Sequence, residues 1–273
     1  MKNKIVIIGK KGFLGSNLNY YLKKKNFVLN LNYKMFIKKK LSFINNFNYI
    51  INCVSNHEYI NNKYLKKNDF DLTIANKIKN LNIKMIMLSS RKVYVAASNL
   101  KETSILNPKS NYSKNKLRTE KSLLKILKEK ILILRIGNVV GLHKKNHNKL
   151  HKIFTDVFFE NVKKGLIFEN KNSYKDFISL NMFCEIVEKL IISNAYGVYN
   201  VSLGKKVFLK KIVSWLNFYN KKNVRLIASK KNYKADNFTL NNDKLMNSIK
   251  IKNTIQELKK YCIKLSKEIF KND

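Results

Sequence analysis

Residues 4–15 read Lys-Ile-Val-Ile-Ile-Gly-Lys-Lys-Gly-Phe-Leu-Gly, and this stretch decides the fold. Its residues 5–8 form an unbroken β-branched run, which is typical of a strand buried on both faces. Gly9, Gly12 and Gly15 follow at a spacing of three, and a helical pattern begins at Phe13. Glycines let the backbone approach a ligand closely, and the first amides of a helix face an anion. The stretch therefore predicts a strand, a phosphate-binding turn and a helix, against the alternative of a plain turn with incidental glycines.

Apolar runs alternate with helical patterns along the rest of the first half. We expect strands at 27–31, 49–54, 83–88 and 131–136, and helices at 69–81 and 112–128. After residue 138 the alternation loosens, and we expect helices at 151–164, 180–193, 207–219 and 254–270 and short strands at 198–201 and 224–227. This pattern predicts an α/β fold with a doubly wound parallel sheet covered on both faces. Because no low-complexity linker precedes the second part, we expect it to pack on the first.

The formal net charge of +39 is the most unusual feature of the composition. Dense positive charge favours nucleic acid, but nearly all of it is lysine spread along the chain, and Arg occurs only at 91, 118, 135 and 225. Because Arg makes the bidentate phosphate and base contacts, its scarcity argues against nucleic acid as the main partner. Attraction of an anionic small substrate is a simpler consequence of the same field.

The cysteines and the hydropathy indicate a cytoplasmic protein without a membrane partner. Cys53, Cys184 and Cys262 lie far apart, which predicts free thiols in a reducing compartment rather than disulfides or a zinc site. No apolar run is long enough to span a bilayer, and the first fifteen residues do not have the pattern of a signal peptide.

A histidine series follows the last strand of the first half. His143, His147 and His151 lie four apart and would share one face of a helix, as a metal cluster requires. A solvated lysine-rich segment is the simpler interpretation, and a substrate contact by one of them is the other alternative. We expect no metal here.

Three segments stand where strands end or a helix begins: residues 88–94 (LSSRKVY), 112–116 (YSKNK) and 134–141 (LRIGNVVG). The carboxyl ends of parallel strands form the ligand crevice of a doubly wound sheet, so we expect these segments beside the glycine turn. Tyr112 and Lys116 would share one helix face, where an ammonium stabilises the phenolate and lowers the pKa of the phenol. A serine hydroxyl nearby can bond the same substrate oxygen. Such a set can move a proton while a nicotinamide moves a hydride.

Together the segments resemble the extended short-chain dehydrogenases/reductases, also called the NAD-dependent epimerase/dehydratase family. Tyr-x-x-x-Lys alone also occurs by chance from Tyr20 to Lys24, but six segments stand in the family's order: 9–15, 89–94, 107–116, 135–141, 175–178 and 197–201. The resemblance implies a Rossmann-type NAD(P)-binding domain at 1–140 and a smaller C-terminal α/β substrate-binding portion at 141–273. It implies NADP or NAD as cofactor and a nucleotide-linked sugar as substrate, and it leaves a homodimer open.

The resemblance also assigns roles to single residues. Tyr112 would be the acid/base on a sugar oxygen, Lys116 would lower the pKa of Tyr112 and hold the nicotinamide ribose, and Ser90 would orient the sugar oxygen. Further cofactor contacts would come from Gly9, Gly12, Phe13, Leu14, Gly15, Cys53, Val54, Ser55 and Leu88. Further substrate contacts would come from Asn138 and from Lys175, which stands where the family commonly carries an arginine.

Two departures from the family pattern narrow the chemistry. Asn32 and Lys34 follow the second strand where an acid would bond the ribose of NAD, which favours NADP. Arg91 and Lys92 replace the Asp-Glu pair of the sugar 4,6-dehydratases, so dehydration lacks its general acid and base. We therefore expect reduction of a 4-keto sugar. The alternatives are an NAD-retaining 4-epimerase, which uses the same three catalytic residues, and a non-catalytic dinucleotide- or RNA-binding protein.

Overall fold

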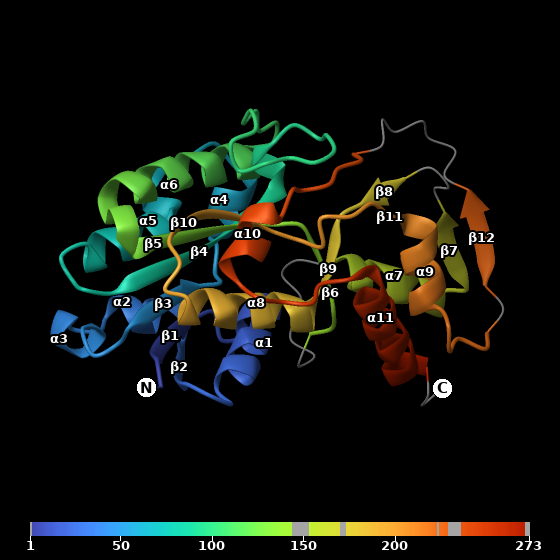
Figure 1. Ribbon diagram of the computed structural model, residues 1–273, viewed down its shortest axis with the longest axis horizontal. Coiled ribbons are helices and arrows are strands. Elements are labelled where there is room, and N and C mark those ends of the chain that lie inside the picture. Colours follow the sequence, from blue (N-terminus) through green and yellow to red (C-terminus); the bar gives the residue numbers. More distant parts are fainter. Residues whose placement is uncertain (1, 144–152, 170–172, 223, 229–235, 271–273) are drawn as a thin grey trace.

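A six-stranded parallel sheet organises the larger part of the molecule (Figure 1). The computed structural model describes residues 2–143, 153–169, 173–222, 224–228 and 236–270. In order across the sheet, the strands are β2 (Phe27–Leu31), β1 (Lys4–Ile8), β3 (Tyr49–Asn52), β4 (Lys84–Ser90), β5 (Ile131–Ile136) and β10 (Gly197–Val201). Every neighbouring pair is parallel, which confirms the expected doubly wound sheet. Because β2 and β3 lie on opposite sides of β1, the strand order changes direction there, and such a switch point opens a ligand crevice.

Helices cover both faces of this sheet. One face packs against α1 (Phe13–Leu22), α8 (Leu180–Ile192) and the short α10 (Asp243–Ser248). The other face packs against α5 (Phe70–Ile78) and α6 (Asn111–Leu127), with α4 (His57–Asn61) and the 3-10 turns η1 (Lys66–Asn68), η2 (Arg91–Val93) and η3 (Lys128–Lys130) in the connections. β3 and β5 are buried along their whole lengths, as the apolar runs predict for strands covered on both faces.

The connection between β2 and β3 contains two short helices that the sequence pattern does not indicate, α2 (Tyr33–Ile37) and α3 (Leu41–Ile44). The Asn32 side chain caps α2 by accepting a hydrogen bond from the Met35 amide at 2.8 Å. Phe36 and Ile44 are buried against the sheet. Each helix buries one side chain, and α2 alone has a side-chain cap, so neither helix is long enough or regular enough to produce a readable period in the sequence.

A smaller part of the fold has its own apolar core, formed around α7 (Phe154–Lys163), α9 (Leu209–Leu216) and α11 (Ile255–Phe270). Three strand pairs accompany them: β6 (Asn138–Val140) with β9 (Phe177–Ser179), β7 (Leu166–Glu169) with β12 (Arg225–Ala228), and β8 (Tyr174–Lys175) with β11 (Val207–Phe208). This part lies beside the large sheet (Figure 1). After entering the smaller part, the chain returns to the larger one: α8 packs on the large sheet, and β10 is the last strand of that sheet. The expected division at residue 140 does not include this return.

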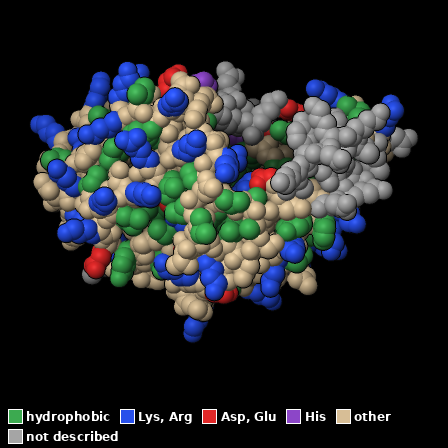
Figure 2. Space-filling model, turned by 90° about the horizontal axis from the view of Figure 1, so that it is seen from above, with side chains coloured by type: hydrophobic (Ala, Val, Ile, Leu, Met, Phe, Trp, Pro, Cys, Tyr) green, Lys and Arg blue, Asp and Glu red, His purple; other side chains and the backbone are tan. Residues whose placement is uncertain are grey.

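The surface carries its charge broadly. On the face seen in Figure 2, Lys and Arg side chains are scattered over the molecule rather than gathered over one element. Several acids are withdrawn from the surface: Asp69, Asp71, Glu120, Asp156, Asp176 and Glu188 are buried. Within the described ranges, no helix is both long and apolar enough to cross a membrane.

Candidate active site

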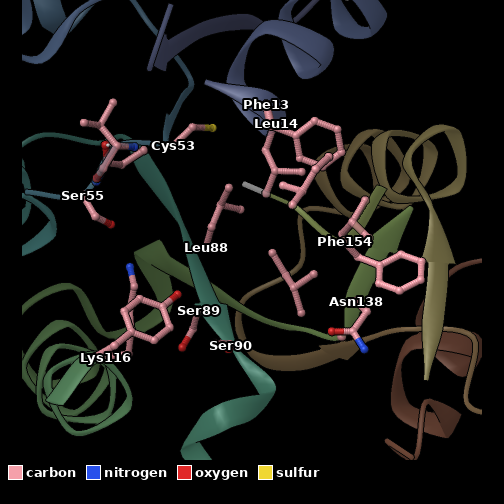
Figure 3. Close-up of a pocket in the computed structure, with 17 residues that line it drawn as sticks. Phe13, Leu14, Cys53, Ser55, Leu88, Ser89, Ser90, Lys116, Asn138 and Phe154 are labelled. Carbon is pink, nitrogen blue, oxygen red and sulfur yellow. Dashed lines mark hydrogen bonds between the residues drawn. The ribbon is translucent and has the colours of Figure 1, made fainter. Parts of the chain in front are cut away.

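A cavity of about 370 Å³ lies at the carboxyl ends of the central strands (Figure 3). Its lining comes from the start of α1, the ends of β3, β4 and β5, and the starts of α6 and α7. The lining residues are Phe13, Leu14, Asn52, Cys53, Val54, Ser55, Leu88, Ser89, Ser90, Tyr112, Lys116, Ile136, Gly137, Asn138, Val139, Ile153 and Phe154. The topology therefore brings the glycine turn and the three chemistry-bearing segments together at one edge of the sheet.

The glycine turn joins β1 to α1, and the first residues of α1 line the cavity. Gly9 has a φ of +134°, a conformation that side chains rarely adopt, and its amide donates to the Leu31 carbonyl at 2.9 Å. Gly12 caps α1 without a side-chain hydrogen bond, so the first helical amides stay available to an anion. Phe13 and Leu14 line the cavity, whereas Gly9, Gly12 and Gly15 shape the backbone behind them.

The loop after β3 is held in place by the last residue of that strand. Asn52 accepts from the Val54 amide at 3.2 Å and donates to the Val54 carbonyl at 3.0 Å. This clamp shapes the segment Cys53–Val54–Ser55, which lines the cavity. Burial, with a smaller contribution from Asp71, raises the pKa of the Cys53 thiol well above its usual range, so Cys53 is a neutral wall of the site rather than a nucleophile.

Helix α6 presents the predicted acid/base pair. Its start is fixed because the Ser110 side chain accepts from the Ser113 amide at 3.2 Å and the Ser113 side chain bonds back to Ser110. Tyr112 is half-buried, and among the described residues nothing hydrogen-bonds its hydroxyl. Lys116, one turn further, is 3% exposed. The pair thus reaches the cavity from one helix face.

Ser90 ends β4 in the middle of the cavity, between Lys116 on one side and Asn138 on the other (Figure 3). Its hydroxyl oxygen accepts from the Lys92 amide at 3.2 Å. Because that bond uses an oxygen lone pair, the hydroxyl proton is left to be donated to a ligand.

Asn138 contributes an unpaired polar group. Its backbone amide donates to the Asp176 carbonyl at 3.1 Å, which fixes the start of β6. Its side-chain nitrogen Nδ2 is buried and has no partner among the described residues. A buried donor without an acceptor costs about 1–3 kcal/mol, so an acceptor on a ligand would relieve that cost.

Besides the three glycines of the turn, three more predicted contact residues lie outside the cavity lining. Asn32 caps α2, and Lys34 in that helix is exposed. Lys175 places its Nζ 3.1 Å from the Asp236 carbonyl oxygen and 3.5 Å from its carboxylate Oδ2. The same carboxylate accepts hydrogen bonds from both terminal nitrogens of Arg91, so Lys175 and Arg91 share one acidic partner, Asp236.

The histidine series is described only at its first member. His143 places Nε2 3.2 Å from Oδ2 of the buried Asp156, and its ring lies 5.2 Å from the Phe13 ring. His147 and His151 lie outside the described residues. In the described part of the chain, no three potential metal-binding side chains gather in one place.

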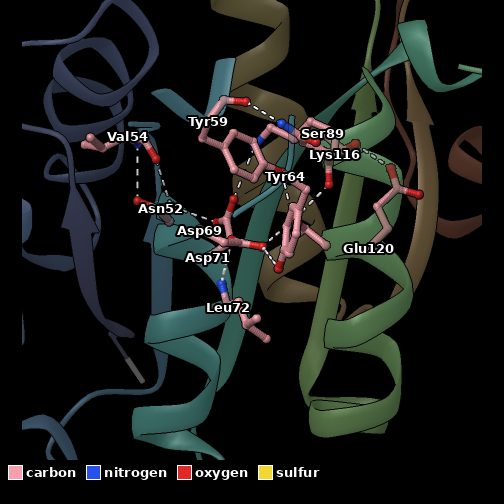
Figure 4. A network of polar contacts seen from close by, with 12 residues as sticks. Asn52, Val54, Tyr59, Tyr64, Asp69, Asp71, Leu72, Ser89, Lys116 and Glu120 are labelled. Carbon is pink, nitrogen blue, oxygen red and sulfur yellow. Dashed lines mark hydrogen bonds and ion pairs between the residues drawn. The ribbon is translucent and has the colours of Figure 1, made fainter. Parts of the chain in front are cut away.

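Two residues of the network around Lys116, Asp71 and Asn52, were not predicted from the sequence. Lys116 Nζ lies 3.2 Å from Asp71 Oδ2, and Asn52 Nδ2 donates to Asp71 Oδ1 at 2.7 Å (Figure 4). An acid in the first turn of a helix, beside an apolar face, is ordinary in a sequence. No local signal could have linked Asp71 to Lys116, which stands 45 residues away.

A second buried network lies behind Ser90. Arg135 on β5 donates to Glu120 Oε2 at 2.7 Å and to the Tyr94 hydroxyl at 2.8 Å. Glu120 also bonds Ser89, and it lies one helical turn beyond Lys116 on α6. This network ties β4, β5 and α6 together directly behind the predicted catalytic residues.

Comparisons place this geometry among known proteins. Residues 2–155 match the family described as the RmlD substrate binding domain. The fold is similar to a UDP-N-acetylglucosamine 4-epimerase from Methanobrevibacter ruminantium in complex with UDP-N-acetylmuramic acid, with a TM-score of 0.80, 20% identity and 100% of both chains covered. It is similar to a dTDP-4-dehydrorhamnose reductase from Clostridium acetobutylicum, with a TM-score of 0.74, 18% identity and 94% and 98% covered.

A third similar structure is RMD from Pseudomonas aeruginosa complexed with NADPH, with a TM-score of 0.73, 14% identity and 98% of both chains covered. A search of the curated proteins finds no sequence match. At these identities the solved structures support the fold, and residues 2–155 carry the family match.

Proposed function

Since this chain belongs to the RmlD substrate-binding family, within the extended short-chain dehydrogenases/reductases, we propose that it is an NAD(P)-dependent oxidoreductase that reduces the 4-keto group of a nucleotide-linked sugar. The observation that supports this most is the shared cavity. Ser90, Tyr112 and Lys116 line it together with Phe13 and the loop after β3. A dinucleotide and a sugar can meet there within reach of one acid/base set.

The residues at the cavity fit a dinucleotide. The uncapped start of α1 offers amides to a diphosphate, the 53–55 loop offers a shaped wall, and Lys116 offers ammonium protons to ribose hydroxyls. The reduced nicotinamide supplies a hydride when it is bound. The absence of an acid at Asn32 and Lys34 favours NADP, and tighter binding of NAD than NADP in a direct titration would contradict that preference.

The chain's own residues would handle the proton. Tyr112 donates its hydroxyl proton to the carbonyl oxygen of the substrate as the carbon accepts the hydride, which turns the ketone into an alcohol. Ser90 donates a hydrogen bond to the same oxygen and keeps it aimed at Tyr112. Asn138 Nδ2, which has no partner within the described ranges, offers a further donor to the sugar nucleotide.

A 4-epimerase is the second candidate, and the similarity to the Methanobrevibacter ruminantium 4-epimerase favours it. An epimerase takes a hydride and returns it to the opposite face, so it retains its oxidised cofactor through the cycle. A reductase consumes a reduced cofactor and must exchange it. The cofactor found in the purified protein therefore separates the two.

The test is to extract the nucleotide from purified protein and then to follow NADPH oxidation with 4-keto nucleotide sugars. Exchangeable NADPH with turnover supports reduction, whereas tightly retained NAD with interconversion of sugar epimers supports the second candidate. Tyr112→Phe should abolish turnover and keep cofactor affinity, and unchanged turnover would overturn the mechanism. Tyr20→Phe is the matched control, because Tyr20 stands in the same Tyr-x-x-x-Lys spacing on the exposed side of α1.

The third interpretation, a non-catalytic dinucleotide- or RNA-binding protein, predicts different results. Salt-sensitive RNA binding without nucleotide binding would favour an RNA-associated role, since phosphate contacts by lysines weaken steeply with salt. Nucleotide binding that is unaffected by Tyr112→Phe, with no turnover of any sugar nucleotide, would favour a non-catalytic dinucleotide-binding protein.

A further inference from the structure

The predicted catalytic lysine does not stand alone in its pocket. Lys116 on α6 and Asp71 on α5 form an ion pair with 3.2 Å between Nζ and Oδ2, and their side chains are only 4% and 5% exposed. Asn52, the last residue of β3, donates to the other carboxylate oxygen at 2.7 Å. Asn52 in turn holds both backbone polar groups of Val54 (Figure 4). A continuous set of contacts thus runs from the 53–55 loop to the lysine.

Lys116 needs such a partner to keep its charge. Burial alone would lower the pKa of this lysine, but the Asp71 carboxylate, with Tyr59 and Tyr112, outweighs burial and raises the pKa above its ordinary 10.5. The titratable groups that interact with it are Asp71 from α5, Tyr59 from α4, Tyr112 from α6 and Cys53 from the loop after β3. Glu120, one turn on, is already bound by Arg135. Asp71 is therefore the carboxylate placed to keep Lys116 an ammonium.

The pair also fixes where the ammonium protons point. An ammonium has three donors in a tetrahedral arrangement. One of them is directed at Asp71, and within the described part of the chain no second hydrogen bond from Nζ is present. Because Lys116 lines the cavity, the remaining two donors are left for groups inside it. Two donors match two needs of the proposed chemistry, the Tyr112 oxygen and a ribose hydroxyl.

We propose that Asp71 is a positioning residue, which acts through Lys116 by holding it as an oriented ammonium, and that Asn52 links this orientation to the 53–55 loop. The inference rests on the proposed function, because it gives Lys116 a task at a cofactor and at Tyr112. It adds to the proposed site a positioning residue that lies outside the Tyr-x-x-x-Lys pattern.

A purely structural role for Asp71 is the competing explanation, and the chain provides a matched control for it. Asp69 is also buried and lies two residues before Asp71, where its Oδ1 caps α5 by accepting from the Leu72 amide at 2.9 Å. Its other oxygen accepts from Thr119 at 2.6 Å and from Tyr64 at 3.0 Å. Asp69 therefore has comparable burial and bonding but no contact with Lys116.

The experiment compares Asp71→Asn with Asp69→Asn in three measurements. The first is a proton–nitrogen correlation spectrum tuned to lysine ammonium groups, assigned by loss of the signal in Lys116→Met. A buried, hydrogen-bonded ammonium exchanges slowly enough to be seen. The second is calorimetric titration with NADPH and NAD. The third is the pH dependence of kcat with the sugar nucleotide that the wild type turns over.

We expect Asp71→Asn to lose the Lys116 ammonium signal at neutral pH and to lower kcat about 10- to 100-fold through misplacement of the lysine. The alkaline limb of kcat in this variant, taken to report loss of the Lys116 proton, should move to lower pH by at least about one unit. The reason is that removing the Asp71 charge at this distance lowers the pKa of Lys116 by that much or more. Asp69→Asn should lower the unfolding midpoint while it keeps the signal and the shape of the pH profile. An unchanged signal and pH profile in folded Asp71→Asn would overturn the proposal.

The double variant Asp71→Asn, Lys116→Met keeps the test decisive if Asp71→Asn does not fold. It removes both buried charges, so it should unfold at a higher denaturant concentration than Lys116→Met, which leaves Asp71 unpaired. Its kcat and cofactor affinity should equal those of Lys116→Met, since Asp71 acts only through the lysine. A further loss in the double variant would contradict the inference. The ammonium signal needs no turnover, so a failure of the proposed reaction is distinguishable from a failure of this inference.

Discussion

The carbonyl oxygen of Gly9 occupies the space that a Cβ on Gly15 would need. The two glycines therefore set how closely α1 approaches the end of β1. Gly12 differs from them, because a Cβ on Gly12 would meet nothing nearer than the Cys53 carbonyl oxygen at 3.9 Å. The three glycines thus differ: Gly15 is a position of close packing, Gly9 has an unusual backbone conformation, and Gly12 has room for a side-chain carbon.

Gly15→Ala should destabilise the protein and weaken cofactor binding. The added methyl group cannot be accommodated without moving α1 away from β1, and overpacking of this kind costs about 1–3 kcal/mol. Urea unfolding and titration with NADPH measure the two effects. Gly12→Ala is the control for stability, since it has room in the folded chain. If both variants unfold at the wild-type midpoint, the close approach of Gly15 to Gly9 is not what fixes the turn.

The Arg135–Glu120 pair should contribute strongly to stability. Both side chains are almost fully buried, at 5% and 1% exposure, so Arg135→Met leaves the Glu120 carboxylate without its cation. Breaking a buried pair in this way costs about 3–5 kcal/mol. Glu185→Gln is the matched surface control, because its pair with Lys189 is more than a third exposed and should contribute less than about 1 kcal/mol. Similar unfolding midpoints for the two variants would contradict this assignment.

The large sheet could be predicted because its inner strands contain continuous apolar runs. Residues 5–8 and 131–134 are such runs and lie in β1 and β5. The residues at the strand ends were likewise predictable, since parallel strands bring their carboxyl ends to one edge. Their roles in the reaction stay predictions until they are tested.

What the sequence could not reveal depends on contacts between distant elements. Asp71 reaches Lys116 only because α5 packs beside α6, and Asn52 joins them from β3. The place of residues 197–201 in the large sheet was equally hidden, because a short apolar strand carries no mark of its neighbour. Lys175 was expected to contact the substrate, and its partner Asp236, which stands 61 residues away, could not be recognised from the sequence.

Lys175 and Asp236 should have opposite effects on substrate affinity. If Lys175 contacts a substrate phosphate, Lys175→Met removes a charged hydrogen bond and should raise KM for the nucleotide sugar about 10- to 100-fold. Asp236→Asn removes the carboxylate that now holds both Lys175 and Arg91, so these cations become available and KM should fall. KM for NADPH is the internal control and should stay constant. A rise in KM for the nucleotide sugar in both variants would mean that the ion pair itself, and not the free lysine, shapes the site.

Asp176 should make stability fall as the pH rises. Its carboxyl is fully buried, and burial raises its pKa from the usual 3.8 to about 7 although Ser202, Gly204 and Leu240 donate hydrogen bonds to it. Between those two pH values the folded state holds a proton that the unfolded state has lost, so the free energy of unfolding declines with pH and levels off above about 7. The total decline attributable to this group is at most about 4 kcal/mol.

Urea unfolding of wild type and Asp176→Asn between pH 4.5 and 8 isolates this effect, because every other group titrates alike in both proteins. The wild type should lose stability relative to the variant as pH rises to about 7, and the difference should then stay constant. An asparagine cannot ionise, so its stability lacks this component. A wild type that gains on the variant with rising pH would mean that the hydrogen-bond donors outweigh burial and that Asp176 is held as a carboxylate at neutral pH.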